Sequence, residues 1–233
     1  MRLSLEIPIP HIEEFLPLTD FPFLLAQHVL DSKYPDSLYG LNSILDNGVY
    51  ELDAPLPDTD IIEAAKICQP ISVIAPDYPD DMRATIGAAA RFRGALYKAF
   101  GDEVCPEVGA VVQGKNLSER IHCATVLFAA KFAPICFPFR TPRAATLAEL
   151  ATQNFFREDW TYHLLGLSDL VELHWNLPGY WSIDTSKPFK GVRLDKTESI
   201  RGHGRLDIDQ KLTLIQREIA CWNIAYMRRI VVS

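Results

Sequence analysis

Short apolar runs alternate with longer amphipathic stretches along this chain, and that order limits the folds it can adopt. The short runs are rich in β-branched and aromatic residues and end abruptly on polar ones, as buried strands do. The longer stretches place apolar residues at helical spacing and begin at Asp or Asn. Repeated strand–helix order predicts a parallel sheet. We expect an α/β fold that closes into a (β/α)8-type TIM barrel, compact and with its last unit abbreviated.

A doubly wound open sheet is the alternative, because hydrophobic periodicity does not report whether a sheet closes. Its usual nucleotide-binding fingerprints, G-x-G-x-x-G and G-x-x-x-x-G-K-[ST], are missing from the sequence. The chain has 233 residues, 48% of them apolar, and no low-complexity tract that would mark a linker. We therefore expect a single domain spanning residues 1–233.

The runs predict the positions of individual elements. We expect residues 3–7 to form an edge strand and residues 21–30 to form the first barrel strand, with His28 near its end. A short helix after residue 168 is expected to be capped by Ser168. Further strands are expected at 42–46, 71–75, 108–112, 134–137, 161–165 and 180–184, and helices at 61–66, 82–100, 116–131, 143–156 and 209–229.

Four of the runs end on a polar side chain: Asp46, Asp77, Gln113 and Asp184. In a parallel barrel the C-terminal ends of the strands form one rim, where α/β enzymes keep their active sites. Carboxylates and an amide at one rim fit glycosidic exchange or hydrolysis, a carboxylate-bound metal such as magnesium, or a structural hydrogen-bond network. These residues alone leave the three interpretations open.

The cysteines indicate no zinc site. The five cysteines form no Cys-x-x-Cys pair and have no histidine at zinc-finger spacing, and an odd, scattered count suits reduced thiols in a cytoplasmic protein. The N-terminus lacks the basic and apolar regions of a signal peptide, and no apolar run reaches membrane-spanning length. We expect a cytoplasmic protein with no membrane partner.

The formal net charge of −7 argues against a protein that coats nucleic acid indiscriminately. A basic segment nevertheless follows Asp184 directly. Charge patterning alone does not decide whether this segment is a solvated loop or a grip on nucleic acid. Its candidate nucleic-acid-binding residues are Lys187, Lys190, Arg193, Lys196, Arg201 and Arg205.

Five short motifs occur in a fixed order: D-N-G-V-Y at 46–50, A-P-D at 75–77, V-V-Q-G at 111–114, H-L-L-G at 163–166 and S-I-D-T-S at 182–186. In this order they resemble the tRNA-guanine transglycosylase superfamily. They are most similar to its compact DpdA-type relatives, which place 7-deazaguanine bases in DNA and many of which bacteriophages encode. The resemblance covers about residues 21–190, and it implies a protein of a bacterium or a phage-infected host cell.

The resemblance implies a role for each matching residue. Asp184 matches the nucleophile that attacks C1′ of the sugar, and Asp46 matches the general acid/base. Tyr50 would stack on the purine. The polar edge of the base would be read by Asp77, Gln113 and the backbone of Gly114.

Base exchange with retained configuration at one anomeric carbon requires two displacements, and therefore a carboxylate nucleophile. The implied reaction needs no cofactor. The implied partners are DNA, less readily tRNA, and a 7-deazaguanine such as preQ0. The target nucleotide would have to leave its stack.

The sequence departs from the family pattern in two places. The zinc-binding Cys-x-Cys-x-x-Cys…His site of the tRNA-modifying members is missing, and the region after the nucleophile strand is the basic segment instead. Residues 136–140 stand where a glycine-containing base-binding segment is expected. The missing zinc subdomain and the short chain favour DNA over tRNA, with Arg140 and Arg143 as additional phosphate contacts. A tRNA-guanine transglycosylase, a non-catalytic nucleic-acid-binding or host-interaction protein on the same barrel, and a metal-dependent hydrolase remain alternatives.

Overall fold

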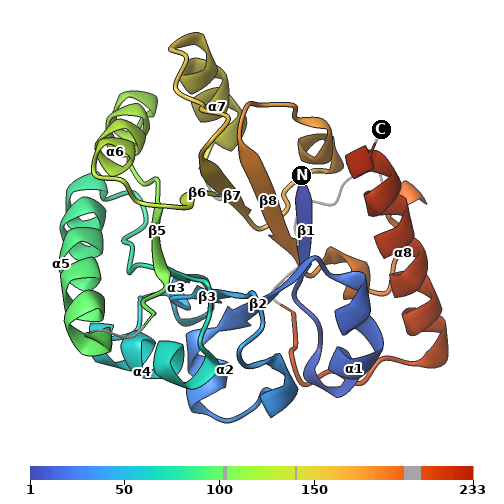
Figure 1. The fold of residues 1–233 in the computed structure, drawn as a ribbon. Coiled ribbons are helices and arrows are strands. Elements are labelled where there is room, and N and C mark those ends of the chain that lie inside the picture. Colours follow the sequence, from blue (N-terminus) through green and yellow to red (C-terminus); the bar gives the residue numbers. More distant parts are fainter. Residues whose placement is uncertain (102–103, 140, 197–205, 233) are drawn as a thin grey trace.

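Eight parallel strands form a closed barrel in chain order, and β8 pairs with β1 to complete it (Figure 1). The computed structural model describes residues 1–101, 104–139, 141–196 and 206–232. Closure confirms the predicted (β/α)8-type barrel and rules out the open sheet. The strands are β1 (Arg2–Leu5), β2 (Phe21–Leu25), β3 (Ile44–Asp46), β4 (Ser72–Ile74), β5 (Glu107–Val111), β6 (Ile135–Pro138), β7 (Thr161–Leu165) and β8 (Tyr180–Thr185).

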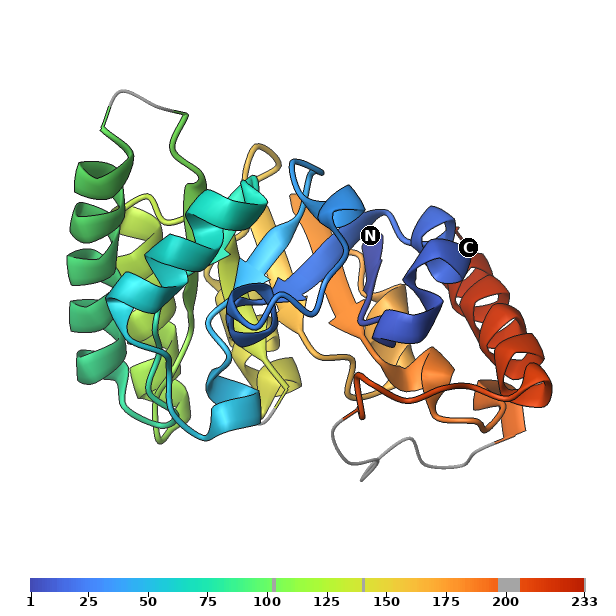
Figure 2. The ribbon, with the colours of Figure 1, turned by 90° about the horizontal axis from the view of Figure 1, so that it is seen from below.

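Helices surround the barrel, with α5 and α8 on opposite sides of it (Figures 1 and 2). The α-helices are α1 (Ile12–Phe15), α2 (Ala26–Leu30), α3 (Val49–Leu52), α4 (Asp58–Cys68), α5 (Met82–Phe100), α6 (Leu117–Ala129), α7 (Arg143–Thr152) and α8 (Leu214–Val232). The 3-10 helices are η1 (Ile9–His11), η2 (Leu16–Leu18), η3 (Asp36–Leu38), η4 (Leu170–His174), η5 (Lys187–Phe189) and η6 (Leu194–Lys196). No helix in the described ranges is both long enough and apolar enough to cross a membrane.

Two predicted helices, α5 and α6, begin where their capping residues indicate, whereas the helix predicted from residue 209 begins at Leu214. The Asp81 carboxylate accepts the main-chain N–H of Ala84 over 2.9 Å at the start of α5, and Gly101 follows its last residue. The Asn116 side chain accepts the N–H of Glu119 over 2.9 Å at the start of α6. Such caps satisfy N–H groups that have no partner within the helix, which is why Asp and Asn mark helix starts in the sequence.

Three local predictions were wrong. β1 is a barrel strand between β2 and β8, and not an edge strand. Residues 26–30 form α2, so His28 lies on a helix and not in the strand. The last unit is not abbreviated, because β8 is followed by the 19-residue α8. The connection after β7 holds η4 in place of an α-helix, and η4 is capped by Asp169 and not by Ser168.

Alternation along the strands separates two apolar regions. Inward-facing residues fill the barrel: Phe21, Phe23, Leu25, Ile44, Ile74, Val111 and Cys136. The intervening residues, such as Leu24, Leu45 and Val73, belong to the larger cluster under the helices. Asp46 follows Ile44 by two positions and Gln113 follows Val111 by two, so the same alternation points both side chains into the barrel above its apolar filling.

Candidate functional site

A cavity of about 680 Å³ lies at the C-terminal ends of the strands. Its wall contains six carboxyl groups, from Glu6, Asp46, Glu51, Asp77, Asp80 and Asp184. The predicted residues Tyr50, Gln113, Lys187 and Lys190 also line it. The strand ends therefore bring together residues that are far apart in sequence, as expected for the catalytic face of a barrel.

Asp184 is buried near the end of β8 and accepts two hydrogen bonds at Oδ1. Nε2 of His163 lies 3.0 Å from this oxygen, and the main-chain N–H of Gly166 donates to it over 2.8 Å. Burial by itself raises the pKa of the carboxyl group. The hydrogen bond and charge of His163, with further hydrogen bonds from Glu6 and Gly166, nevertheless bring the pKa of Asp184 below its usual value. Asp184 is thus held as a carboxylate.

His163 is fully buried and is fixed by its neighbours on both sides. Its ring stacks on Phe23 with 5.5 Å between centroids, and its Nδ1 lies 2.8 Å from Oγ of Ser182. Nε2 of His163 donates to Asp184, and Nδ1 hydrogen-bonds the Ser182 hydroxyl, so both ring nitrogens have a partner. His163 therefore orients Asp184 from below the cavity.

Glu6 was not singled out from the sequence, yet it hydrogen-bonds the carboxyl group of Asp184. Its pKa is raised well above the usual range, first by burial and then by the charge of Asp184. Glu6 directly follows β1, so the rule that identified Asp46 and Asp77 applies to it as well. The expectation that residues 3–7 form an edge strand removed Glu6 from consideration.

Asp46 ends β3 and begins a tight turn. One of its oxygens accepts the main-chain N–H of Gly48 over 3.0 Å. Burial is the main cause that raises the pKa of Asp46 well above its usual value, and the charge of Glu51 adds to it. Asp46 therefore has two roles. It stabilises the turn after β3, and it presents a carboxyl group with a raised pKa to the cavity.

Asp77 and Gln113 form one buried polar unit with Asn47. Asp77 accepts from the Asn47 amide over 2.8 Å and from the Gln113 amide over 2.6 Å. Oε1 of Gln113 in turn accepts the main-chain N–H of Asp80 at 3.3 Å. Burial raises the pKa of Asp77, and these two amide donors oppose the rise. The unit presents a fixed set of carboxylate and amide groups, which suits recognition of a polar ring edge.

Tyr50 and Phe139 both line the cavity and contact each other edge to face, with ring centroids 5.1 Å apart and an interplanar angle of 71°. Phe139 comes from the segment that departs from the family pattern, so an aromatic wall stands where a glycine-containing segment was expected. Gly114 is not among the residues that line the cavity. A Cβ on Gly114 would lie 2.7 Å from Cβ of Glu119, so its lack of a side chain is explained by its close approach to α6.

The predicted basic residues after Asp184 do not all lie at the cavity. Lys187 and Lys190 line the cavity, and burial lowers the pKa of both amines, that of Lys187 to about 8. Arg193 forms an ion pair with Asp195 at 2.9 Å and lies over the Trp222 ring. Lys196 ends η6. Arg201 and Arg205, like Arg140, lie outside the described residues.

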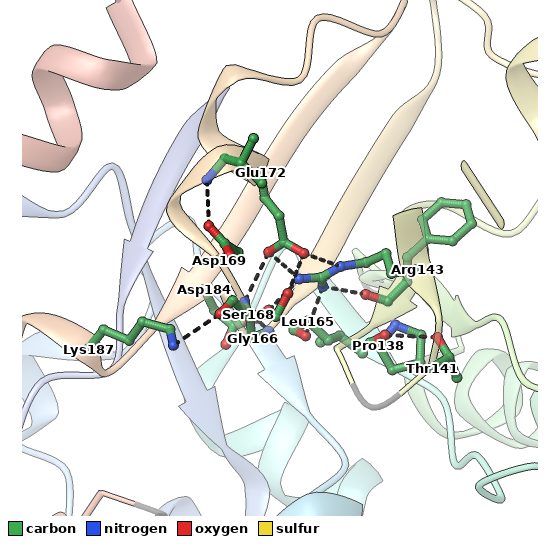
Figure 3. A network of polar contacts seen from close by, with 12 residues as sticks. Pro138, Thr141, Arg143, Leu165, Gly166, Ser168, Asp169, Glu172, Asp184 and Lys187 are labelled. Atoms are coloured by element: carbon green, nitrogen blue, oxygen red, sulfur yellow. Dashed lines mark hydrogen bonds and ion pairs between the residues drawn. The ribbon is translucent and has the colours of Figure 1, made fainter. Parts of the chain in front are cut away.

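A buried ion pair supports the loop after β7 (Figure 3). Nε of Arg143 donates to Glu172 over 3.1 Å, and Nη2 donates to the Gly166 carbonyl over 2.8 Å. The Ser168 main-chain N–H donates to Glu172 over 2.9 Å. Arg143 is only 3% exposed, so the prediction that it contacts phosphate was wrong: its guanidinium is committed to holding the loop.

Within the described ranges, no group of three or more His, Cys, Asp or Glu side chains is arranged to hold a metal ion. The cavity combines a carboxyl group whose pKa is lowered, Asp184, with two whose pKa values are raised, Glu6 and Asp46. Carboxyl groups in opposite protonation states within one cavity can divide nucleophilic and acid–base work.

Comparison with known proteins adds no family to this picture. No protein-family model matches the chain, and no curated protein matches it.

Proposed function

We propose that the chain is a transglycosylase that exchanges guanine in DNA for a 7-deazaguanine base such as preQ0. The observation that carries the proposal is the opposite shift of two carboxyl groups in one cavity: hydrogen bonds lower the pKa of Asp184, whereas burial raises that of Asp46. The resemblance of the five motifs to the transglycosylase superfamily supports the assignment of substrate class.

In the first displacement, an Asp184 oxygen forms a bond to C1′ of the target nucleoside as the bond between C1′ and the guanine nitrogen breaks. The electron pair of the broken bond leaves with guanine, and Asp46 supplies the proton that neutralises it. The sugar is then held as an ester of Asp184.

In the second displacement, the ring nitrogen of the incoming base gives its proton to Asp46 and forms a bond to C1′. The ester bond breaks, and its electron pair returns to Asp184. Two inversions restore the original configuration, and both carboxyl groups end in their starting states. The exchange requires no redox or phosphoryl step.

The remaining cavity residues fit recognition of a flat, polar base. The Asp77–Gln113 unit supplies acceptors and a fixed amide for a purine-like edge, and Tyr50 and Phe139 supply aromatic faces. Lys187 and Lys190 place positive charge at the same cavity, where backbone phosphates of a flipped nucleotide could be held.

Trapping the ester intermediate tests the proposal. Wild-type protein is incubated with guanine-containing DNA or with tRNA, each with and without preQ0, and resolved by denaturing electrophoresis. We expect an adduct with DNA that preQ0 discharges, and incorporation of labelled preQ0 into the DNA. Asp184→Asn should abolish the adduct, whereas Glu63→Gln, at an exposed position on α4, should leave it unchanged.

An adduct with tRNA alone would move the substrate from DNA to tRNA. Binding to nucleic acid without any adduct or incorporation would favour the non-catalytic alternative. Incorporation that is lost with a chelator would favour a metal-dependent reaction.

A further inference from the structure

Glu6 and Asp184 meet where the barrel closes. Ser4 of β1 lies opposite Asp184 of β8, and the main-chain N–H of Glu6 donates to the Thr185 carbonyl over 3.0 Å. Side chains two positions apart on a strand point the same way, so Glu6 projects inward above Ser4 and reaches Asp184. Their carboxyl groups are joined by a hydrogen bond.

A hydrogen bond between two carboxyl groups requires that one of them carries a proton. Asp184 accepts from Gly166 and His163, and these donors favour its charged form. Among the described residues, the groups that raise the pKa of Glu6 are carboxyl groups, and the Lys190 amine also interacts with it. The titratable groups that face it are Asp184 on β8, Asp46 on β3, Glu51 on α3, Tyr34 before η3 and Lys190 after η5. The proton therefore resides on Glu6.

We propose that Glu6 is a positioning residue that acts through Asp184, donating its carboxyl hydrogen to the Asp184 oxygen that does not attack the sugar. This inference rests on the proposed function, because it requires Asp184 to be the nucleophile. It gives a third carboxyl group a part in the reaction, with a role distinct from that of Asp46.

The effect of Glu6 differs between the two displacements. In the sugar ester, Asp184 has lost its charge, and Glu6 donates to a neutral ester carbonyl. As the C1′–O bond breaks, charge returns to Asp184 and the same hydrogen bond becomes charge-assisted, roughly twice as strong as a neutral one. An interaction that is stronger in the transition state than in the preceding ground state speeds the step. In the first displacement, the bond instead stabilises the attacking carboxylate and reduces its nucleophilicity.

The proton on Glu6 can be measured without any assay of activity. Carbon-13 NMR of protein labelled at the glutamate side-chain carboxyl carbons reports ionisation directly, and Glu6→Gln identifies the resonance. We expect Glu6 to remain protonated near neutral pH and its pKa to fall in Asp184→Asn, where the neighbouring charge is removed. An ionised Glu6 near neutral pH, or a pKa unaffected by Asp184→Asn, overturns the proposal.

Single-turnover kinetics test the role. Glu6→Ala should slow the discharge of the DNA adduct by base about 10-fold or more, the loss of one hydrogen bond to a charged group, without slowing adduct formation. The adduct should therefore accumulate. Glu6→Gln keeps an N–H donor and should restore most of the discharge rate. Equal slowing of both steps in Glu6→Ala overturns the role while the proposed function stands, whereas a wild type that forms no adduct overturns the proposed function.

Discussion

The main-chain N–H of Gly166 donates a 2.8 Å hydrogen bond to Oδ1 of Asp184, while the carbonyl of the same glycine accepts from Nη2 of Arg143 over 2.8 Å. One residue thus joins a buried ion pair to the candidate nucleophile. Gly166 has φ of +69°, and a Cβ there would lie 2.9 Å from the Phe139 ring, so glycine is required at this junction. The loop after β7 is as much a part of the site as the strand ends.

Removing one partner of the Arg143–Glu172 pair should destabilise the protein severely. Glu172→Ala leaves a guanidinium that is 3% exposed without its counter-charge, and we expect the free energy of unfolding to fall by about 3–5 kcal/mol. Urea denaturation measures the change. As a control, Arg91→Ala removes a pair with Asp58 in which the Arg91 side chain is 60% exposed, and should cost at most about 1 kcal/mol. Equal losses in the two variants would contradict a supporting role for the buried pair.

Asp46→Asn should raise the free energy of unfolding of the protein and reduce its base-exchange activity. Burial and the charge of Glu51 raise the pKa of Asp46, so between its unfolded and folded pKa values the folded protein binds more protons than the unfolded chain. Stability contributed by this site therefore falls as pH rises through that window. Asparagine retains an acceptor for the Gly48 N–H but cannot ionise.

The free energy of unfolding of Asp46→Asn should accordingly exceed that of wild type near neutral pH, and the difference should vanish below the unfolded pKa of about 3.9. Incorporation of labelled base should fall by about 10²- to 10⁴-fold, as for the loss of a general acid. Unchanged incorporation would remove Asp46 from the chemistry, even if the stability difference is found.

Lys187 should make nucleic-acid binding sensitive to mild alkali. Burial lowers its pKa to about 8, so its positive charge is lost as pH rises through that value. DNA affinity of the wild type should therefore decline across this range, and Lys187→Arg, whose charge persists, should not show the decline. Lys187→Met should reduce the salt dependence of binding by about one phosphate contact. A salt slope unchanged in Lys187→Met would place Lys187 away from the phosphates.

Gly114→Ala should reduce stability because α6 leaves no room for a side chain. The new Cβ would lie 2.9 Å from the main-chain nitrogen of Arg120, and we expect a loss of about 1–3 kcal/mol in urea denaturation. Gly94→Ala is the matched control: Gly94 lies within α5 with nothing within 4 Å of the added Cβ, so the variant should gain roughly 0.5–1 kcal/mol. A stable Gly114→Ala that binds the incoming base less well would instead support the base-reading role.

The barrel and much of its rim could be predicted from the sequence, because the alternation of strands and helices indicates both the fold and which residues end the strands. The residue that ends a buried parallel strand is brought to a common face by the architecture, so Asp46, Asp77, Gln113 and Asp184 could be grouped without knowing any distance. Their protonation states could not be predicted, because these depend on partners contributed by other strands. Asp184 is charged through His163 on β7 and Gly166 in the following loop.

The wrong predictions have a common cause: whether a residue is buried or exposed, and in a strand or a helix, depends on neighbours that are distant in sequence. The sequence around Arg143 suggests an exposed cation. Arg143 is buried because it pairs with Glu172, which lies in a different connection of the barrel. The apolar composition of residues 21–30 suits a buried helix as well as a buried strand, and the chain changes from one to the other after Leu25. Glu6 was missed because residues 3–7 were expected to form an edge strand, whereas pairing with β8 makes this strand part of the barrel.

The pairing of β1 with β8 also determines when the contact between Glu6 and Asp184 can form during folding. Glu6 follows the first of the eight strands, whereas Asp184 lies on the last of them. Contacts between such distant segments form slowly, because a long loop must close before they contribute. Until then, the Glu6 carboxyl group stays in water, where it ionises normally. Proton uptake by Glu6 should therefore accompany the last stage of refolding, and a nascent chain that has not yet released β8 has a partial barrel but no site.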